Sequence, residues 1–205
     1  MSLLNEQQCG EVAEAITRIE RDTDAELVTV LAAQADDYRY IPLLWAGILG
    51  LLLPGVALLV VADLGAHTLF QMQCALFAVL AIVGRVPAIT TRLIPQSVRH
   101  WRAANLARCQ FLEQNLHHTD GATGMLIFVS EAERYVEILV DRGISERLDD
   151  STWEAIVARF TARVRAGDTL AGFLECIDAC GAELHQAVPA THERNELPNR
   201  LVVLD

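Results

Sequence analysis

The sequence predicts an α/β protein, a small sandwich of helices and strands interrupted by an inserted two-helix transmembrane hairpin. Two observations lead to this fold class. The segments 41–62 and 64–84 carry no formal charge, and short helical and strand-like patterns alternate on both sides of them. At a rise of ~1.5 Å per residue, each charge-free segment can cross a hydrocarbon core of ~30 Å. A chain of 205 residues is long enough for one domain and such an insertion.

Composition excludes two broad classes of protein. Hydrophobic residues make up 52 % of the chain, which is too high for a disordered protein. All 16 basic residues are arginine, and they are outnumbered by 27 acidic residues, for a net charge of −11. Because this charge repels polyanions, we do not expect nucleic acid as a partner.

The segment before the hairpin predicts one helix and one strand. Asn5 and Gln8 have the spacing of a capping box, and apolar residues follow at helical spacing. These apolar residues are Leu4, Val12, Ile16 and Ile19. Residues 26–31 are strand-like. One helix and one strand cannot form a stable fold alone, so they need partners from beyond the hairpin.

The hairpin itself consists of the predicted spans 41–62 and 64–84. Pro54 and several glycines lie in the first span, and such residues are tolerated where neighbouring helices satisfy the backbone within a membrane. A buried helix pair in a soluble protein is the alternative interpretation. Two adjacent apolar runs of this length favour the membrane.

The arginines predict the orientation of the hairpin. They stand on both flanks, at Arg39, Arg85, Arg92, Arg99, Arg102 and Arg108, whereas the turn 63–67 contains none. By the positive-inside rule, the N- and C-terminal soluble parts lie in the cytoplasm and the protein is a multi-pass protein of the cell (inner) membrane. The polar N-terminus predicts no cleavable signal peptide. An odd number of cysteines, five, agrees with a reducing compartment.

The segment after the hairpin predicts the remaining elements. A helix over 97–118 has an apolar stripe, two strands at 125–129 and 135–140 form a hairpin through 131–134, and two helices follow. The stripe residues are Val98, Trp101, Asn105, Cys109, Leu112 and Leu116. Ser151 and Glu154 predict a capping box for the first of the last two helices. Cys176 and Cys180 share a face of the second, as small core residues rather than a redox or metal pair.

The predicted organisation is therefore discontinuous. Residues 1–38 and 96–190 form the two parts of one α/β domain, residues 39–95 form the membrane insertion, and residues 191–205 form a C-terminal tail. The tail segment 201–204 is strand-like. It can add an edge strand, cover a groove or pair with a partner's sheet, and we expect it to pack on its own domain.

Several motifs in this chain resemble the TPM domain family. They are Thr123–Val129, Arg134–Ile138, Asp141–Ile144, Trp153, Arg165–Asp168 and Ala171–Gly172. The resemblance covers residues 3–35 and 98–188, and residues 194–198 are similar to the bacterial membrane-inserted branch of the family. Other members include thylakoid-lumen and photosystem-repair proteins. The resemblance implies an α/β/α sandwich and, for some members, a divalent cation, usually calcium, with a proposed acid phosphatase activity.

Acidic residues predict a candidate cation site. If strands 27–31 and 125–129 are parallel and 135–140 is antiparallel to them, one edge of the sheet gathers Asp24, Asp120, Asp141, Glu146, Asp149 and Asp150. Ca²⁺ and Mg²⁺ prefer several oxygen ligands, and we take Asp120, Asp141, Glu146 and Asp150 as the candidate metal ligands. The alternative is that these carboxylates cap helices or are solvated. Where related metal sites often have Gly-Leu-Glu-Gly, this chain has Gly143-Ile144-Ser145-Glu146, with the glutamate displaced by one residue.

No nucleophile has a convincing setting, so the catalytic residues are unknown. Ser130 is expected at the opposite edge of the sheet, and His117 and His118 are expected to end a helix. The first functional hypothesis is a non-catalytic, membrane-anchored module that binds or maintains another membrane protein. The alternative is a divalent-metal-dependent phosphatase-type hydrolase. A transporter ranks third, because two spans without an intramembrane charge form no pathway.

Overall fold

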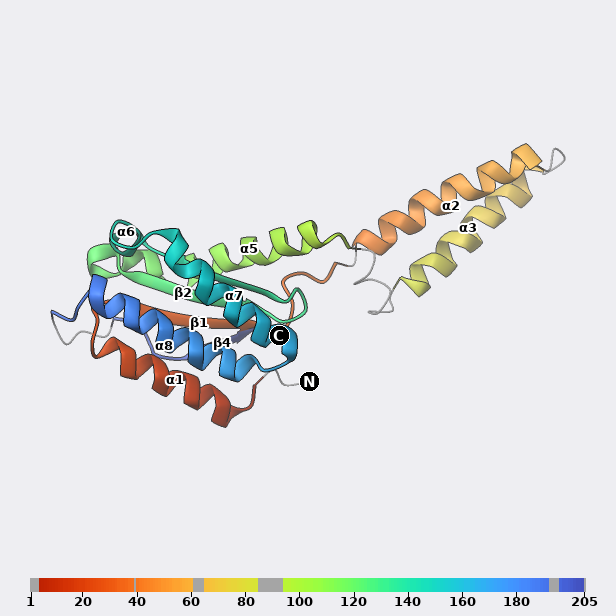
Figure 1. Ribbon diagram of the computed structural model, residues 1–205. Coiled ribbons are helices and arrows are strands. Elements are labelled where there is room, and N and C mark those ends of the chain that lie inside the picture. Colours follow the sequence, from red (N-terminus) through yellow and green to blue (C-terminus); the bar gives the residue numbers. More distant parts are fainter. Residues whose placement is uncertain (1–3, 39, 61–64, 85–93, 192–195, 205) are drawn as a thin grey trace. The chain divides into compact units, whose positions relative to one another are not determined.

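The structure is a computed structural model that describes residues 4–38, 40–60, 65–84, 94–191 and 196–204 (Figure 1). Its chain divides into two compact units. The first contains residues 1–35 and 100–205, and the second contains residues 36–99. The first unit is therefore built from two segments of chain that the second unit separates in sequence.

A four-stranded sheet forms the centre of the first unit. Its strands are β1 (Glu26–Ala32), β2 (Gly124–Ser130), β3 (Tyr135–Val140) and β4 (Leu201–Leu204), in the order β3-β2-β1-β4. β1 is parallel to β2 and to β4, and β3 is antiparallel to β2. These directions confirm the predicted topology. The tail supplies an edge strand to its own sheet, so it is part of the domain rather than a separate appendage.

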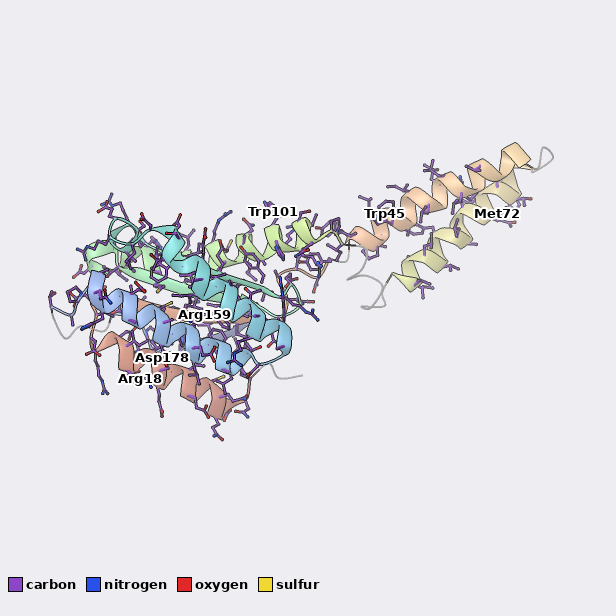
Figure 2. The ribbon with its side chains drawn as sticks, viewed as in Figure 1. Arg18, Trp45, Met72, Trp101, Arg159 and Asp178 are labelled. Carbon is purple, nitrogen blue, oxygen red and sulfur yellow. The ribbon has the colours of Figure 1, made fainter. Side chains whose placement is uncertain are left out.

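Three helices cover one face of the sheet: α1 (Glu6–Glu20), α7 (Asp150–Ala166) and α8 (Thr169–Ala187). Alternate strand residues, including Leu27, Leu31 and Ile127, pack against them. Phe160 of α7 and Phe173 of α8 meet edge to face, with ring centroids 4.9 Å apart. At the surface, Arg18 of α1 pairs with Asp178 of α8 at 2.5 Å (Figure 2).

One helix, α5 (Gln96–Glu113), supplies the cover for the other face of the sheet. Its Ala103 and Ala107 pack against strand residues that include Val30 and Phe128. Every residue of β1 and β2 is buried, as expected for strands covered on both faces. The first unit is thus a three-layer α/β/α arrangement.

Two details of the sequence analysis are corrected by the structure. The predicted stripe was wrong over α5, because Trp101, Asn105, Cys109 and Leu112 are exposed, whereas its last member, Leu116, is buried. Small alanines face the sheet instead, since they let the helix backbone approach it closely. The helix ends at Glu113, and the single-turn helix η1 (Leu116–His118) follows.

Of the two capping boxes that the sequence predicts, the one at the start of α1 is present and the one at the start of α7 is not. The capping box of α1 is present, with Gln8 N donating to Asn5 Oδ1 at 2.8 Å and Asn5 N donating to Gln8 Oε1 at 2.9 Å. The capping box predicted at Ser151 was wrong, because α7 already begins at Asp150 with Asp149 as its N-cap. Asp149, two residues before Ser151, occupies the cap position without a side-chain capping bond, and Asp150 adds a carboxylate in the first turn, where negative charge is favoured.

The second unit is a pair of helices, α2 (Tyr40–Val60) and α3 (Ala66–Val83), which pack side by side. A Cβ placed on Gly50 would lie 3.2 Å from Phe77 Cβ, so the helices approach closely there. Among the described residues, α3 is long and apolar enough to cross a membrane, and α2 counts as a shorter apolar helix over Tyr40–Val56. The predicted turn residues Asp63 and Leu64, and the flanking Arg39, Arg85 and Arg92, lie outside the described residues.

Candidate functional site

Loops from three strands converge at the end of the sheet where β1 and β2 begin and β3 ends. Thr123 links them, because its carbonyl accepts a hydrogen bond from Glu26 N at 3.2 Å and its hydroxyl donates to Asp24 O at 2.8 Å. Asp141 N donates to Gly124 O at 2.9 Å. Thr123 Oγ1 also donates to Asp120 O at 3.2 Å, so these bonds connect the backbones of Asp24, Asp120 and Asp141, three of the six acidic residues expected at this edge. We call Asp24, Glu26, Asp120, Asp141 and Glu196 the acidic edge.

The carboxylates of the acidic edge hold the C-terminal part of the chain. Asp24 accepts hydrogen bonds from Thr191 N at 2.8 Å and from Thr191 Oγ1 at 2.5 Å. Glu26 is buried and accepts from Glu196 N at 2.9 Å and from Leu197 N at 3.1 Å. Glu196 in turn accepts from Asp120 N at 3.0 Å. These bonds position the segment that leads into β4.

Glu20, the last residue of α1, places a carboxyl group beside Glu26. Its Oε1 accepts a hydrogen bond from Leu27 N at 2.8 Å, whereas Oε2 is buried without a hydrogen bond in the described part of the chain. Burial raises the pKa of Glu20 to about 8, the Leu27 N–H and the Asn199 side chain oppose this shift, and the charge of Glu26 adds to it. Glu20 is thus mainly protonated at neutral pH.

The candidate metal ligands are engaged locally. Asp141 is the N-cap of the short helix α6 (Arg142–Ser145), and its Oδ1 accepts a hydrogen bond from Arg142 N at 2.7 Å. Glu146 pairs with the Arg142 guanidinium at 3.4 Å. Asp150 lies in the first turn of α7, and Asp120 begins the single-turn helix η2 (Asp120–Ala122). Such positions near helix starts favour carboxylates without any metal.

No group of three or more His, Cys, Asp or Glu side chains among the described residues is positioned to hold a metal ion. Backbone carbonyls lie close to two glycines at this edge. A Cβ on Gly143 would lie 2.1 Å from Gly121 O, and one on Gly124 would lie 2.1 Å from Leu116 O. These close approaches explain the glycines by packing. The Ca²⁺ or Mg²⁺ site at Asp120, Asp141, Glu146 and Asp150 stays a prediction.

A buried carboxylate, that of Glu133, lies at the opposite end of the sheet, where Ser130 ends β2. Ser130 is buried and its hydroxyl donates to the buried Glu133 carboxylate. Glu133 also accepts a hydrogen bond from Ala35 N at 3.1 Å. The serine hydroxyl is enclosed and already bonded, so it has no access to a substrate. His117 and His118 are exposed on η1, with ring centroids 4.1 Å apart.

The two cysteines of α8 are core residues. Cys176 and Cys180 are buried, with their sulfur atoms 4.0 Å apart. The hydrogen bond from the neighbouring thiol, together with burial, raises the pKa of the Cys180 thiol well above its ordinary value. A thiol that resists deprotonation is a poor nucleophile and a poor metal ligand.

The second unit carries a large exposed apolar surface. Side chains such as Trp45 and Met72 project away from the helix pair (Figure 2). In α2 one side of the helix is buried, at Pro42, Ala46, Gly50 and Pro54. The remaining large exposed apolar side chains of the two helices are Tyr40, Leu43, Leu44, Ile48, Leu51, Leu52, Leu53, Val56, Phe70, Phe77, Val79, Ile82 and Val83. No residue of α3 is buried. A surface of this kind is unfavourable in water and is typical of contact with lipid or protein.

Sequence reasoning missed Glu20, Glu26 and Glu133. Glu26 and Glu133 could have been found, because each is a charged residue inside or beside an otherwise apolar strand. Burying such a residue is costly unless hydrogen bonds offset the lost hydration of its carboxylate. Glu26 opens β1, and Glu133 lies in the turn after β2. Nothing in the local sequence indicates that Glu20, rather than its neighbour Arg21, is turned inward.

Comparisons with known proteins agree with the fold. Residues 89–183 match the TPM domain family. The solved NMR structure of the BA42 protein from the psychrophilic bacterium Bizionia argentinensis is similar, with a TM-score of 0.61 and 15 % sequence identity, over 98 % of this chain and 94 % of that one. At this identity the likeness concerns the fold alone. No curated protein matches the chain.

Proposed function

Because this chain carries a TPM domain over residues 89–183, we propose that it is a membrane-anchored TPM module. In this proposal the pair α2 and α3 crosses the bilayer as a hairpin. The α/β/α domain lies on the cytoplasmic side and binds and helps to maintain another membrane protein.

The pairing of β1 with β2 carries this proposal. β1 precedes the helix pair and β2 follows it, and the two strands pair in register from Glu26↔Gly124 to Ala32↔Ser130. Residues on both sides of the helix pair therefore belong to one folded body and must lie in one compartment. If α3 crosses a membrane, the chain must cross it an even number of times. A returning α2 meets this requirement.

The surface of the helix pair supports a lipid environment. α3 has the length and composition of a membrane span, and none of its residues is buried within the protein. Burying such a surface in a hydrocarbon core removes it from water, at about 25 cal/mol per Å² of apolar area. Arg99, Arg102 and Arg108 follow α3 in the sequence, which favours a cytoplasmic domain by the positive-inside rule.

The polar groups that could serve catalysis are hydrogen-bonded within the protein, which favours a binding role over a catalytic one. The carboxylates of the acidic edge hold Thr191, Glu196 and Leu197, and the Ser130 hydroxyl is buried against Glu133. The outer face of α5 instead offers exposed Trp101 and Leu112, and Arg102 stacks on Trp101 with its guanidinium carbon 5.0 Å from the ring centroid. Exposed aromatic and arginine side chains are enriched where proteins bind partners.

Cysteine accessibility tests the topology. In single-cysteine variants that retain Cys109 of α5, or carry Gly65→Cys at the start of α3, a membrane-impermeant maleimide is applied to spheroplasts and to inverted vesicles. We expect Cys109 to react only in inverted vesicles and the Gly65→Cys variant to react only in spheroplasts. Extraction of the protein by alkaline carbonate, or reaction of Cys109 from outside, contradicts the proposal.

Photo-cross-linking in membranes tests the partner. A photoreactive amino acid replaces Trp101 or Leu112 on the outer face of α5, and Glu154 of α7 serves as the exposed control. We expect a discrete adduct with one integral membrane protein from the α5 positions and none from the control. Absence of adducts from every position contradicts the binding role while leaving the membrane anchor intact.

A further inference from the structure

The two glutamine side chains of α3 differ in their contacts. α3 contains two neighbouring glutamines, and Gln71 is bonded to His67, with Gln71 Nε2 3.1 Å from His67 Nε2. Gln73 is half-buried, and its amide makes no hydrogen bond with any described residue. An amide within hydrocarbon finds no water to bond, so it favours a partner on another helix.

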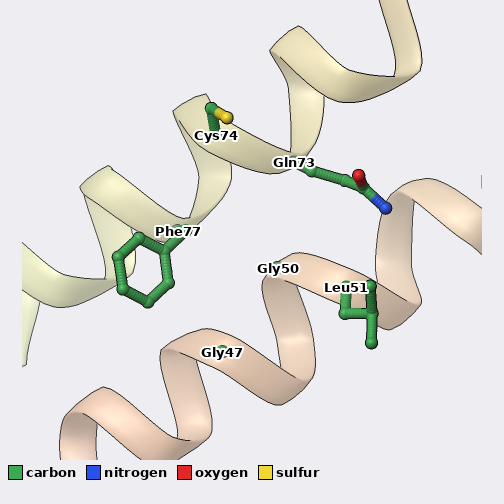
Figure 3. Close-up of a pocket in the computed structure, with 6 residues that line it drawn as sticks. All are labelled: Gly47, Gly50, Leu51, Gln73, Cys74 and Phe77. Atoms are coloured by element: carbon green, nitrogen blue, oxygen red, sulfur yellow. The ribbon is translucent and has the colours of Figure 1, made fainter. Parts of the chain in front are cut away.

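The Gln73 side chain borders a cavity between the two helices (Figure 3). The cavity has a volume of about 240 Å³ and is lined by Gly47, Gly50 and Leu51 of α2 and by Gln73, Cys74 and Phe77 of α3. Gly47 has open space where a Cβ would stand. Small residues leave the backbone of α2 accessible, which allows another helix to approach closely within a membrane.

We propose that this cavity is the contact surface between two copies of the chain in the membrane, with the two Gln73 amides hydrogen-bonded to each other. This inference rests on the proposed membrane insertion of α2 and α3. A primary amide carries both donors and an acceptor, so two copies related by a two-fold axis satisfy each other. Leu51 and Phe77, both exposed, supply the apolar contacts around the pair.

The chemistry of the amide favours a second copy over a lipid chain. An acyl chain can fill an apolar cavity, but it offers no hydrogen-bond donor or acceptor, and Gln73 stays unsatisfied. A second copy brings the complementary group to the same depth of the membrane without any other component. The helix of an unrelated protein is a further occupant that the experiment distinguishes.

Cys74, which also lines the cavity and is exposed, reports the contact. The full-length chain is expressed with Cys9 and Cys109 replaced by serine, and membranes are oxidised with copper phenanthroline. We expect a disulfide-linked dimer through Cys74. The matched control replaces Cys74 by serine and introduces Val79→Cys, an exposed position of α3 outside the cavity lining, which should give little dimer.

Substitutions of the two glutamines test the role of the amide. Gln73→Leu should reduce the cross-linked fraction at least about threefold, in line with measured hydrogen bonds between membrane helices. Gln73→Asn should restore part of it. Gln71→Leu, which removes an amide already bonded within α3, should leave the fraction unchanged.

Each outcome bears on the inference separately from the proposed function. Full cross-linking of Gln73→Leu, no Cys74 dimer, or an adduct of Cys74 with a different protein overturns the pairing of two copies. In all three cases the protein still resists carbonate extraction if the membrane anchor is correct. Loss of the wild-type protein from the carbonate-washed pellet instead overturns the proposed function, and this inference with it.

Discussion

Replacing Glu20 by glutamine should make the protein more stable at neutral pH. Burial holds the pKa of Glu20 at about 8, against an ordinary value of 4.5 in the unfolded chain. Between these two values the folded protein binds a proton that the unfolded chain has released. Folding stability therefore falls as the pH rises from about 4.5 to about 8 and is constant above that range. Glutamine carries no titrating proton and keeps an acceptor for Leu27 N.

The size of the effect follows from the shift. Each pH unit within this window costs about 1.4 kcal/mol of unfolding free energy. The wild-type protein should thus lose about 3 kcal/mol between pH 5 and pH 7 through this one group. The Glu20→Gln variant should be more stable than the wild type by about 3 kcal/mol at pH 7, and the difference should approach zero near pH 4.5.

Urea unfolding of the full chain in detergent micelles measures this difference. Trp153 is 5 % exposed and reports on the α/β/α domain once Trp45 and Trp101 are replaced by phenylalanine. Glu14→Gln, an exposed glutamate of the same helix, is the matched control and should leave the pH dependence unchanged. The reasoning is refuted if Glu20→Gln destabilises the protein at pH 7, or if its effect is the same at pH 5 and pH 7.

Three further predictions use the same unfolding measurement or calorimetry. Gly172→Ala should lower the unfolding free energy by about 1–3 kcal/mol, because the added Cβ would lie 2.4 Å from Phe160 Cδ2. Gly10→Ala, whose Cβ would meet nothing within 4 Å, should raise the unfolding free energy by about 0.5–1 kcal/mol, and equal effects of the two substitutions contradict this packing argument. Glu133→Ala should lower the unfolding free energy by about 2 kcal/mol, because the Ser130 hydroxyl and Ala35 N lose this acceptor, and Glu133→Gln should lower it less. If Glu133→Ala leaves the unfolding free energy unchanged, these hydrogen bonds do not stabilise the fold. If Asp120, Asp141, Glu146 and Asp150 hold Ca²⁺ or Mg²⁺, calorimetric titration should give one site per chain that Asp141→Asn abolishes, and no heat of binding contradicts that site.

The strands were predictable because their sequence signals are local. β2 is a continuous apolar run between turn residues, and in the structure it is covered on both faces. The antiparallel hairpin of β2 and β3 follows from the short connection between them, and the parallel pairing of β1 with β2 follows from a long one. The tail strand β4 was also foreseen as one of three alternatives, and its pairing with β1 selects among them.

The packing face of α5 was not predictable in the same way. Periodicity ranks large apolar residues above alanine, and it selected Trp101 and Leu112 as buried. The sheet instead accepts Ala103 and Ala107, because a close approach of helix and sheet is decided by both surfaces at once. The outer residues then remain free to contact a partner.

By itself, the sequence determined the α/β class and the strand directions, and it predicted the interruption of the domain by an apolar helix pair and the gathering of acids at one end of the sheet. Each of these follows from periodicity, connection length or local charge, which act over a few neighbouring residues. Only the tertiary structure decided what the acids do. Asp24 and Glu26 hold the returning tail, and burial of the half-buried Glu20 raises its pKa to about 8. The role of a carboxylate depends on its burial and on hydrogen-bond donors that the fold brings from distant parts of the chain.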